Sequence, residues 1–265
     1  MTELVFLKLG GSLITDKAHP FTPRLDCIRP IAREVRRALD GRPALSLLLG
    51  HGSGSFGHQA AAQHGTRRGV HSAAQWRGYA DVAAAAARLN RIVMDELLAA
   101  GVPAVSLQPS ASAACRDGVL VHLETGPVRL ALERGLVPLL YGDVAFDERR
   151  GGTIISTEDI FVYLAARLFP ARILLAGKAA GVLDPRGSLV PHISPATFPA
   201  IASFLSGSHT VDVTGGMADK VAQMVALVQQ QDVEVEIFSG RDSSWVYRSL
   251  VEPDFSPGTR IARRM

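Results

Sequence analysis

Two glycine-rich segments of the sequence combine a pliable backbone with hydroxyl and ammonium side chains. The first, KLGGSLITDK, covers residues 8–17, and the second, GHGSGSFGH, covers residues 50–58. Each follows an apolar run of strand character. Glycine lets backbone N–H groups approach phosphate oxygens closely, and successive N–H groups form an anion-binding nest. The pair predicts a phosphate site, although neither segment matches the G-x-x-x-x-G-K-[ST] motif of P-loop enzymes. Tight turns with surface lysines are the alternative interpretation.

The lysines are few, and all of them lie near glycine. Of the 28 basic residues only four are lysine, namely Lys8, Lys17, Lys178 and Lys220. In a chain so biased toward arginine, lysine is expected to survive where a compact ammonium is needed and a guanidinium fork does not fit. Glycine loops with facing lysines are typical of phosphoryl transfer, in which catalysis is positioning plus charge neutralisation. Chance and compositional drift are the alternative explanation.

The second segment also carries candidate hydrogen-bond donors. Ser53, Gly54 and Ser55 are expected to present backbone amides, and a helix is expected to begin just after them, with its N-terminus favouring an anion. His58 would then lie one turn inside that helix, within reach of a phosphate or a leaving oxygen. A lone histidine is more often structural than functional, and both interpretations of His58 stay open.

Strand-like and helix-like segments alternate along the chain. Apolar runs predict strands at 4–10, 44–50, 103–108, 118–123, 136–143, 172–177, 233–238 and 258–262. Helical spacing predicts helices at 28–40, 73–100, 157–168 (capped by Ser156 or Thr157), 214–231 and 243–250. This alternation predicts a three-layer αβα sandwich around a mostly parallel sheet. The glycine clusters would gather along its carboxyl edge, where such sheets bind ligands.

Residues 1–265 are interpreted as a single domain with a large core, because 47% of them are apolar and no repeat or linker is present. A soft lobe boundary is expected near residues 170–176, since Pro170 separates a helix from the next strand. No apolar run approaches the ~18 residues of a membrane span, so no membrane association is expected. The N-terminus carries Glu3 and Lys8 and is interpreted as a strand rather than a signal peptide.

Cysteine content and charge exclude further classes of protein. Cys27 and Cys115 are too few for a disulfide scaffold or a four-cysteine zinc site, so a cytoplasmic location is expected. The net charge of +3 comes with arginines scattered in pairs rather than in a stripe among aromatic residues. No nucleic-acid partner is therefore expected, and a mildly basic surface suits an anionic small molecule equally well.

Five motifs resemble those of the amino acid kinase superfamily: KLGGS…ITDK, HGSGSFGH, GDV (142–144), ISTEDI (155–160) and DVTGGMADK (212–220). Within it they look like the isopentenyl phosphate kinases, in order and spacing from Lys8 to the closing GTRI. The histidine of GSFGH, together with DVTGGM, is the most discriminating feature, since acetylglutamate and aspartate kinases lack that histidine. The resemblance implies the amino acid kinase fold and ATP-dependent phosphorylation of isopentenyl phosphate to isopentenyl diphosphate, an isoprenoid precursor.

The resemblance also implies roles for individual residues. Lys8, Lys17 and His58 would be catalytic, with Lys17 stabilising the transferring phosphoryl group. Ser53, His58 and Thr157 would bind the substrate phosphate. Asp143 and Glu158 would orient the lysines, because acidic partners keep clustered ammonium groups charged. ATP would be bound by residues from both lobes: Lys8, Leu9, Gly10, Gly11, Ser12, Gly54, Lys178, Gly216 and Lys220. The N-terminal lobe would bind the acceptor and dimerise, and the C-terminal lobe would bind the nucleotide.

Three positions depart from the family pattern. Ser53 interrupts the usual Gly-Gly-Gly, and Thr157 replaces a frequent glycine. In AGKAAGV (176–182), Lys178 and Ala180 replace the acids of the usual T-D-V-D-G-V. Uridylate kinases of the superfamily carry a lysine in the corresponding segment, which keeps Lys178 as an expected nucleotide contact.

Mg²⁺ is expected to travel with ATP, because no carboxylate cluster in the sequence indicates a metal site made by the protein alone.

The helix at 75–93 carries an apolar stripe that could line a pocket for the substrate tail, with core or dimer packing as the alternative: Trp76, Tyr79, Val82, Ala83 and Ala86. A homodimer through this long helix is expected.

Two rival functions stay open at this point. A fosfomycin-type kinase would phosphorylate a small polar phosphonate, and an apolar pocket would argue against it. A non-catalytic member of the fold would only bind a nucleotide or an anion. The retention of Lys17 and Lys220 weighs against that second rival, because pure binding has less need of a transition-state cation.

Overall fold

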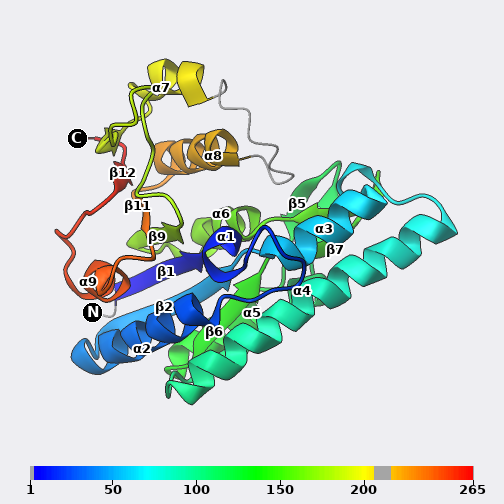
Figure 1. The fold of residues 1–265 in the computed structure, drawn as a ribbon, viewed down its shortest axis with the longest axis horizontal. Coiled ribbons are helices and arrows are strands. Elements are labelled where there is room, and N and C mark those ends of the chain that lie inside the picture. The colour runs from blue at the N-terminus through cyan, green and yellow to red at the C-terminus, as the bar shows by residue number, and fades with distance from the viewer. Residues whose placement is uncertain (1–2, 206–215, 265) are drawn as a thin grey trace.

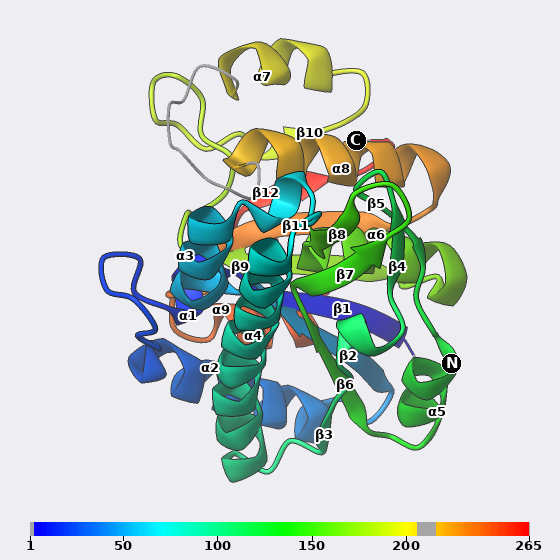
Figure 2. The ribbon, with the colours of Figure 1, turned by 90° about the vertical axis from the view of Figure 1, so that its right-hand side faces the viewer.

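An eight-stranded sheet runs through the molecule, and helices cover both of its faces (Figures 1 and 2). The structure is a computed structural model that describes residues 3–205 and 216–264, apart from the side chains of residues 58–60, 62 and 63. The strand order is β10-β12-β11-β9-β1-β2-β6-β3, and every neighbouring pair is parallel except β11 and β12. The predicted α/β sandwich with a mostly parallel sheet is therefore confirmed.

The strands of this sheet are short and apolar. Their bounds are β1 (Glu3–Leu9), β2 (Leu45–His51), β3 (Ala104–Ser106), β6 (Val137–Tyr141), β9 (Arg172–Gly177), β10 (His192–Ile193), β11 (Glu234–Ser239) and β12 (Thr259–Ile261). Along β1 the side chains alternate between the two cores: Val5 and Leu7 pack toward α2 and α4, whereas Phe6 packs toward α6 and α8. Burial on both faces explains why β1 is a continuous apolar run.

The described helices include the predicted ones and several that the periodicity did not indicate. Their bounds are α1 (Gly11–Ile14), α2 (Leu25–Gly41), α3 (Gly54–His64), α4 (Ala73–Ala99), α5 (Gly126–Glu133), α6 (Thr157–Leu168), α7 (Phe198–Leu205), α8 (Gly216–Gln230) and α9 (Trp245–Val251), with 3₁₀ turns η1 (Thr66–Arg68) and η2 (Pro109–Ala111). Thr214, the predicted start of α8, lies outside the described residues. No helix in the described part of the chain is long and apolar enough to cross a membrane.

A second, four-stranded sheet was not predicted. It has the order β5-β4-β7-β8 and consists of β4 (Ala114–Arg116), β5 (Val119–His122), β7 (Asp143–Asp147) and β8 (Gly151–Ile155). The predicted strand at 118–123 is β5 of this sheet rather than a strand of the large one. Asp147 stabilises both hairpin turns, since its carboxylate accepts the N–H groups of Asp117, Gly118, Arg149 and Arg150. These contacts join distant segments, so local periodicity could not indicate them.

Helix α6 begins at a well-defined cap. The Ser156 side chain accepts the N–H of Asp159, and the Asp159 carboxylate accepts the N–H of Ser156, which together form a capping box. Of the two caps considered from the sequence, the structure therefore has Ser156. This cap fixes the first turn of α6, which carries Thr157 and Glu158.

Candidate active site

One cavity opens where loops meet at the carboxyl ends of β1, β2, β8 and β9. Its volume is about 270 Å³, and all four lysines of the chain line it: Lys8, Lys17, Lys178 and Lys220. Glycine and hydroxyl residues from the two glycine-rich segments and from the start of α6 form much of the remaining wall. Ammonium groups and backbone N–H groups at helix starts make this cavity suited to an anion.

The two glycine-rich segments pack directly against each other beside the cavity. A methyl group on Gly52 would lie 2.8 Å from the nitrogen of Gly11, and one on Gly11 would collide with the backbone of Gly54. Gly54 has a φ of +49°, a conformation that side chains with a Cβ rarely adopt. The N–H of Ser55 donates to Thr15 Oγ1 at 2.9 Å and links the segments further. The glycines are therefore required for the two loops to meet.

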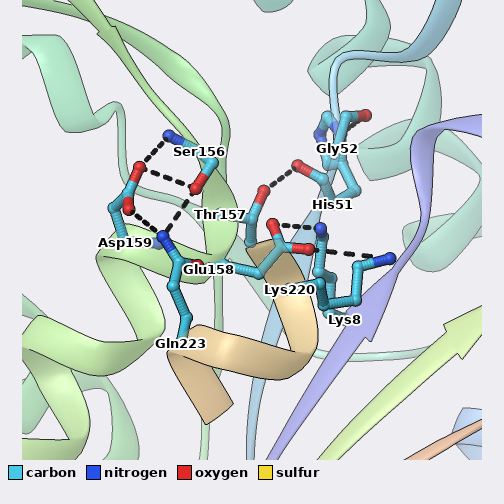
Figure 3. Close-up of polar contacts among 9 residues, drawn as sticks. All are labelled: Lys8, His51, Gly52, Ser156, Thr157, Glu158, Asp159, Lys220 and Gln223. Carbon is cyan, nitrogen blue, oxygen red and sulfur yellow. Dashed lines mark hydrogen bonds and ion pairs between the residues drawn. The ribbon is translucent and has the colours of Figure 1, made fainter. Parts of the chain in front are cut away.

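Glu158 joins two of the lysines (Figure 3). Its carboxylate forms an ion pair with Lys8 of β1 and another, at 3.9 Å, with Lys220 of α8. Lys8 and Glu158 are both buried, with 7% of each residue exposed. Burial alone would raise the pKa of Glu158, but the two ammonium groups outweigh burial and lower it to about 2. Glu158 is therefore ionised at neutral pH and holds Lys8 in place.

Asp143, the other acid expected to orient the lysines, has different partners. It begins β7, and its carboxylate accepts the N–H of Ser110 at 3.1 Å and that of Val144 at 2.8 Å. Burial raises its pKa. Among the described residues Asp143 forms no ion pair with a lysine, and it does not line the cavity. The expectation for Asp143 is corrected accordingly: it anchors η2, whereas Glu158 forms the ion pairs with Lys8 and Lys220.

Ser53 and Thr157, which were expected to bind the substrate phosphate, both line the cavity. The hydroxyl of Thr157 donates to the carbonyl of His51 at 2.6 Å, so it links α6 to the second glycine-rich segment (Figure 3). Thr157 is also the first residue of α6, where its backbone N–H has no carbonyl partner within the helix. Ser53 is the residue immediately before α3. Both positions supply helix-start N–H groups to the cavity wall.

The other expected ATP-binding residues divide between cavity and core. Gly10, Gly11, Ser12, Gly54 and Gly216 line the cavity. Lys17 lies on an exposed loop after α1, and Lys178 lies on an exposed loop directly after β9. Leu9 is 1% exposed and packs in the core, so its side chain does not line the cavity. His58 belongs to α3, but its side chain lies outside the described part of the structure.

The apolar stripe of α4 packs in the core. Tyr79, Val82 and Ala86 are buried, Ala83 is half-buried against the core, and Trp76 is 37% exposed. None of the five lines the cavity as the described residues define it. Core packing, one of the alternatives given with the sequence, therefore accounts for Tyr79, Val82, Ala83 and Ala86 but not for Trp76. The apolar wall of the cavity comes instead from other elements, and it includes Ile154, Ile155, Leu175, Met217 and Ile237.

A buried polar group behind the second glycine-rich segment was not predicted from the sequence. His51 is fully buried, stacks on Tyr141 with ring planes 9° apart, and lies 3.2 Å from Asn90 of α4. Asn90 is 4% exposed and accepts a hydrogen bond from Ser106 of β3. The only signal in the sequence is an asparagine among the apolar positions of a long helix, which without the fold has no visible partner.

The cavity offers few ligands for a metal ion. Glu158 is engaged by two lysines, and Asp219 is the other acid on the wall. Across residues 3–205 and 216–264 there is no group of three or more histidine, cysteine or acidic side chains that could hold a metal. These residues do not fit a metal bound by the protein alone.

Known proteins similar to this chain were found both by sequence and by structure. The model of the amino acid kinase family matches residues 3–239. Isopentenyl phosphate kinase of Methanocaldococcus jannaschii is 33% identical over 96% of this chain and 99% of its own, and that of Haloferax volcanii is 41% identical over 85% and 88%. A solved structure described as an isopentenyl phosphate kinase superposes with a TM-score of 0.83 at 31% identity, covering 98% of this chain and 100% of the other.

Proposed function

The chain belongs to the amino acid kinase family, and from that membership we propose that it transfers the γ-phosphoryl group of ATP to isopentenyl phosphate, yielding isopentenyl diphosphate and ADP. The observation that carries this proposal is that every lysine of the chain and both glycine-rich loops line one and the same cavity. An enzyme that joins two phosphates must offset repulsion between two anions, and four ammonium groups at one cavity supply that charge. The relatives named above favour neither the fosfomycin-type kinase nor a non-catalytic binding protein.

In the proposed reaction an oxygen of the acceptor phosphate attacks the γ-phosphorus of ATP. The new oxygen–phosphorus bond forms as the bond from the γ-phosphorus to the β–γ bridging oxygen breaks, and ADP leaves with that electron pair. The acceptor oxygen is already anionic near neutral pH, so no strong general base is required. Positioning and charge neutralisation by the chain's own residues then carry the catalysis.

The proposed roles of the cations follow from where they lie. Lys8 is buried and held by Glu158, so it is a fixed charge suited to the phosphate chain of ATP. Lys220 shares Glu158 from the start of α8, close to Gly216. Lys17 is the last residue of the first glycine-rich segment and lines the cavity, where we place it on the transferring phosphoryl group.

The acceptor phosphate is assigned to the wall formed by Ser53 and Thr157, together with His58 as a donor. The N–H groups at the starts of α3 and α6 support this assignment. Ile154 and Ile155 precede Thr157 on the same wall, and we assign the apolar tail of the acceptor to them. In this arrangement the N-terminal lobe binds the acceptor, and Lys178, Gly216 and Lys220 from beyond residues 170–176 bind the nucleotide.

Mg²⁺ is proposed to arrive with ATP, because the cavity wall does not offer the carboxylates that would hold it independently. When bound, the ion would neutralise part of the charge on the phosphate oxygens. The ammonium groups of Lys8, Lys178 and Lys220 would supply the rest from the protein.

We further propose a cytoplasmic homodimer. Both cysteines are free, which suits a reducing compartment. Helix α4 leaves large apolar side chains exposed, with Trp76 at 37% and Leu98 at 50%, and such side chains are suited to a contact between copies.

A substrate panel tests the proposed function. The purified protein, ATP and Mg²⁺ would be incubated with isopentenyl phosphate, dimethylallyl phosphate, fosfomycin or uridylate, and ADP release and product mass would be measured. The highest kcat/KM is expected with isopentenyl phosphate. Preferential turnover of fosfomycin or uridylate would replace the proposal by that activity, and nucleotide binding without turnover of any acceptor would support the non-catalytic alternative.

A further inference from the structure

A run of buried polar side chains leads from the edge of the large sheet to the cavity wall. Ser106 Oγ donates to Asn90 Oδ1 at 2.6 Å, Asn90 Nδ2 lies 3.2 Å from His51 Nε2, and His51 Nδ1 lies 3.1 Å from the carbonyl oxygen of Gly52. Figure 3 shows the last of these contacts, next to the Thr157 hydrogen bond to the His51 carbonyl. The run crosses three elements, β3, α4 and the end of β2.

The contacts have one consistent direction. The Asn90 amide nitrogen can only donate, so His51 Nε2 must accept, and a neutral imidazole then carries its proton on Nδ1. That proton is donated to the carbonyl of Gly52. Burial lowers the pKa of His51 to about 4, with Lys8 acting in the same direction. The imidazole is therefore neutral at physiological pH, as this direction of donation requires.

The run ends on the peptide between Gly52 and Ser53, whose carbonyl oxygen accepts the hydrogen bond from His51. Gly52 has no Cβ, and glycine readily adopts many backbone angles. In a trans peptide the carbonyl of one residue and the N–H of the next point to opposite sides. When the Gly52 carbonyl is held by the buried His51 ring, the N–H of Ser53 is directed away from that ring. Ser53 lines the cavity, and within the described residues its N–H has no hydrogen-bond partner.

We propose that Ser106, Asn90 and His51 form a positioning chain that holds the Gly52–Ser53 peptide so that the Ser53 N–H donates to phosphate in the cavity. This inference rests on the proposed function and adds residues of α4 and β3 to it. These residues act through the peptide and touch no substrate themselves. Replacing the polar run by apolar side chains would still fill the core, so packing alone does not account for it.

The first test measures kinetics. Asn90→Leu fills the same space without a donor, so the His51 ring and the Gly52 peptide lose their fixed orientation. We expect kcat and kcat/KM to fall together, by roughly 10- to 100-fold, because a donor that positions the attacking acceptor phosphate is misplaced. The Kd for ATP, measured by calorimetry, should change little. Ser106→Ala should reduce kcat by a smaller factor, and Ser106→Thr, which keeps the hydroxyl, should restore it.

A matched control separates positioning from stability. Val93 lies one turn after Asn90 on α4 and is fully buried, but it makes no polar contact with the run. Val93→Ala should lower the melting temperature while leaving kcat per folded molecule close to that of the wild type. If Asn90→Leu and Val93→Ala lower kcat in proportion to their loss of stability alone, the positioning role is wrong.

The second test does not depend on activity. In ¹⁵N spectra of the histidine rings, with His51 assigned by its loss in His51→Gln, the wild type should show His51 protonated on Nδ1 and not titrating between pH 5 and 8. Asn90→Asp should move the proton to Nε2, because a carboxylate can only accept. A wild-type His51 protonated on Nε2, or titrating in that range, would overturn the inference. Failure of the wild type to phosphorylate isopentenyl phosphate would instead overturn the proposed function.

Discussion

Glu158 lies between lysines from opposite ends of the chain, and this residue sets the charge state of the cavity wall. Lys8 is buried on β1 and Lys220 lies on α8, and Glu158 forms an ion pair with each. Breaking a buried ion pair by removing one partner leaves an uncompensated charge, which is costly. At the scale of single residues, the positions of Lys8 and Lys220 therefore depend on Glu158.

Glu158→Gln removes the negative charge and keeps the size of the side chain. Burial lowers the pKa of Lys8, and Glu158 opposes that shift. Without Glu158 the pKa of Lys8 falls further, so Lys8 loses its proton at a lower pH than in the wild type. The alkaline limb of the kcat–pH profile should therefore move to lower pH. Asp219→Asn, which removes an exposed acid of the same wall, is the control and should leave the limb in place. A limb that stays unmoved in Glu158→Gln would contradict this role.

Lys17→Met tests the cation assigned to the transferring phosphoryl group. The variant should fold normally and bind ATP with unchanged Kd, because Lys17 lies on an exposed loop. Its kcat should fall by roughly 10³-fold, as expected when a transition-state cation is removed. Single-turnover kinetics with saturating ATP would measure this loss. If the variant kept more than about a tenth of the wild-type turnover, Lys17 would not stabilise the transition state.

Lys178→Ala tests the side of the cavity on which the loop after β9 acts. Lys178 follows β9 in the C-terminal half of the chain, and the start of α8 with Gly216 and Lys220 belongs to the same half. The KM for ATP should therefore rise more than the KM for isopentenyl phosphate, by roughly 10-fold for a lost charge-assisted contact. Steady-state titration of each substrate at saturating levels of the other gives both values. A larger rise for the acceptor would place this loop on the acceptor side.

At the scale of elements, the cavity depends on two helix starts and on the contact between two glycine loops. Helix α6 presents Thr157 and Glu158 from a capped first turn, and α3 begins directly after Ser53. The loops meet so closely that Gly11 and Gly54 leave no room for a Cβ between them. Close packing of backbone on backbone fixes the shape of the wall before any ligand binds, which reduces the cost of positioning phosphate groups.

Gly54→Ala and Gly65→Ala form a matched pair for this contact. Both residues have a positive φ, +49° for Gly54 and +63° for Gly65, but a methyl group on Gly65 meets open space. Both variants should lose about 1–2 kcal/mol of stability from the strained backbone. Gly54→Ala should lose more stability than Gly65→Ala, because its methyl group collides with Thr15 Oγ1 and the carbonyl oxygen of Gly11. Its kcat should also fall sharply. Urea unfolding and kinetics of both variants would show this. Equal effects would mean that the loops are not in contact.

At the scale of the whole molecule, the parallel sheet brings together residues that are far apart in the chain. Strands β1, β2 and β9 are neighbours, so their carboxyl ends open on one edge and place three loops around the cavity. The long helix α4 crosses one face of the sheet, supplies Asn90 behind the cavity wall and exposes apolar residues elsewhere (Figure 2). The same helix is thus suited both to support the site and to contact a second copy.

The proposed homodimer can be checked by light scattering coupled to size exclusion. The wild type is expected at twice the chain mass of 28.2 kDa. Leu98→Glu should shift the mass toward that of one chain, because a charge would be buried in an apolar contact. Phe169→Glu, at an exposed position after α6, is the control and should leave the mass unchanged. A wild type that elutes as a single chain would contradict the dimer.

The sequence by itself determined the fold class and the residues of the cavity loops. Apolar strands followed by glycine, as at 4–11 and 44–54, are local patterns, and parallel sheets bind ligands at that edge. The four lysines were recognisable because arginine otherwise replaces them. Local patterns sufficed here because strand ends, loop glycines and rare residue types can be read from neighbouring positions.

Only the tertiary structure decided which partners these residues have. Asp143 and Glu158 looked equivalent in sequence, yet one accepts backbone N–H groups of a turn and the other binds two lysines. The small sheet was not predicted, and the two interpretations of the α4 stripe stayed open, for the same reason: turn contacts and core faces join segments far apart in the chain. His51 and Asn90 likewise acquire their partners from different elements. Burial and direction of hydrogen bonding are properties of the packed molecule, so they are absent from any local pattern of residue types.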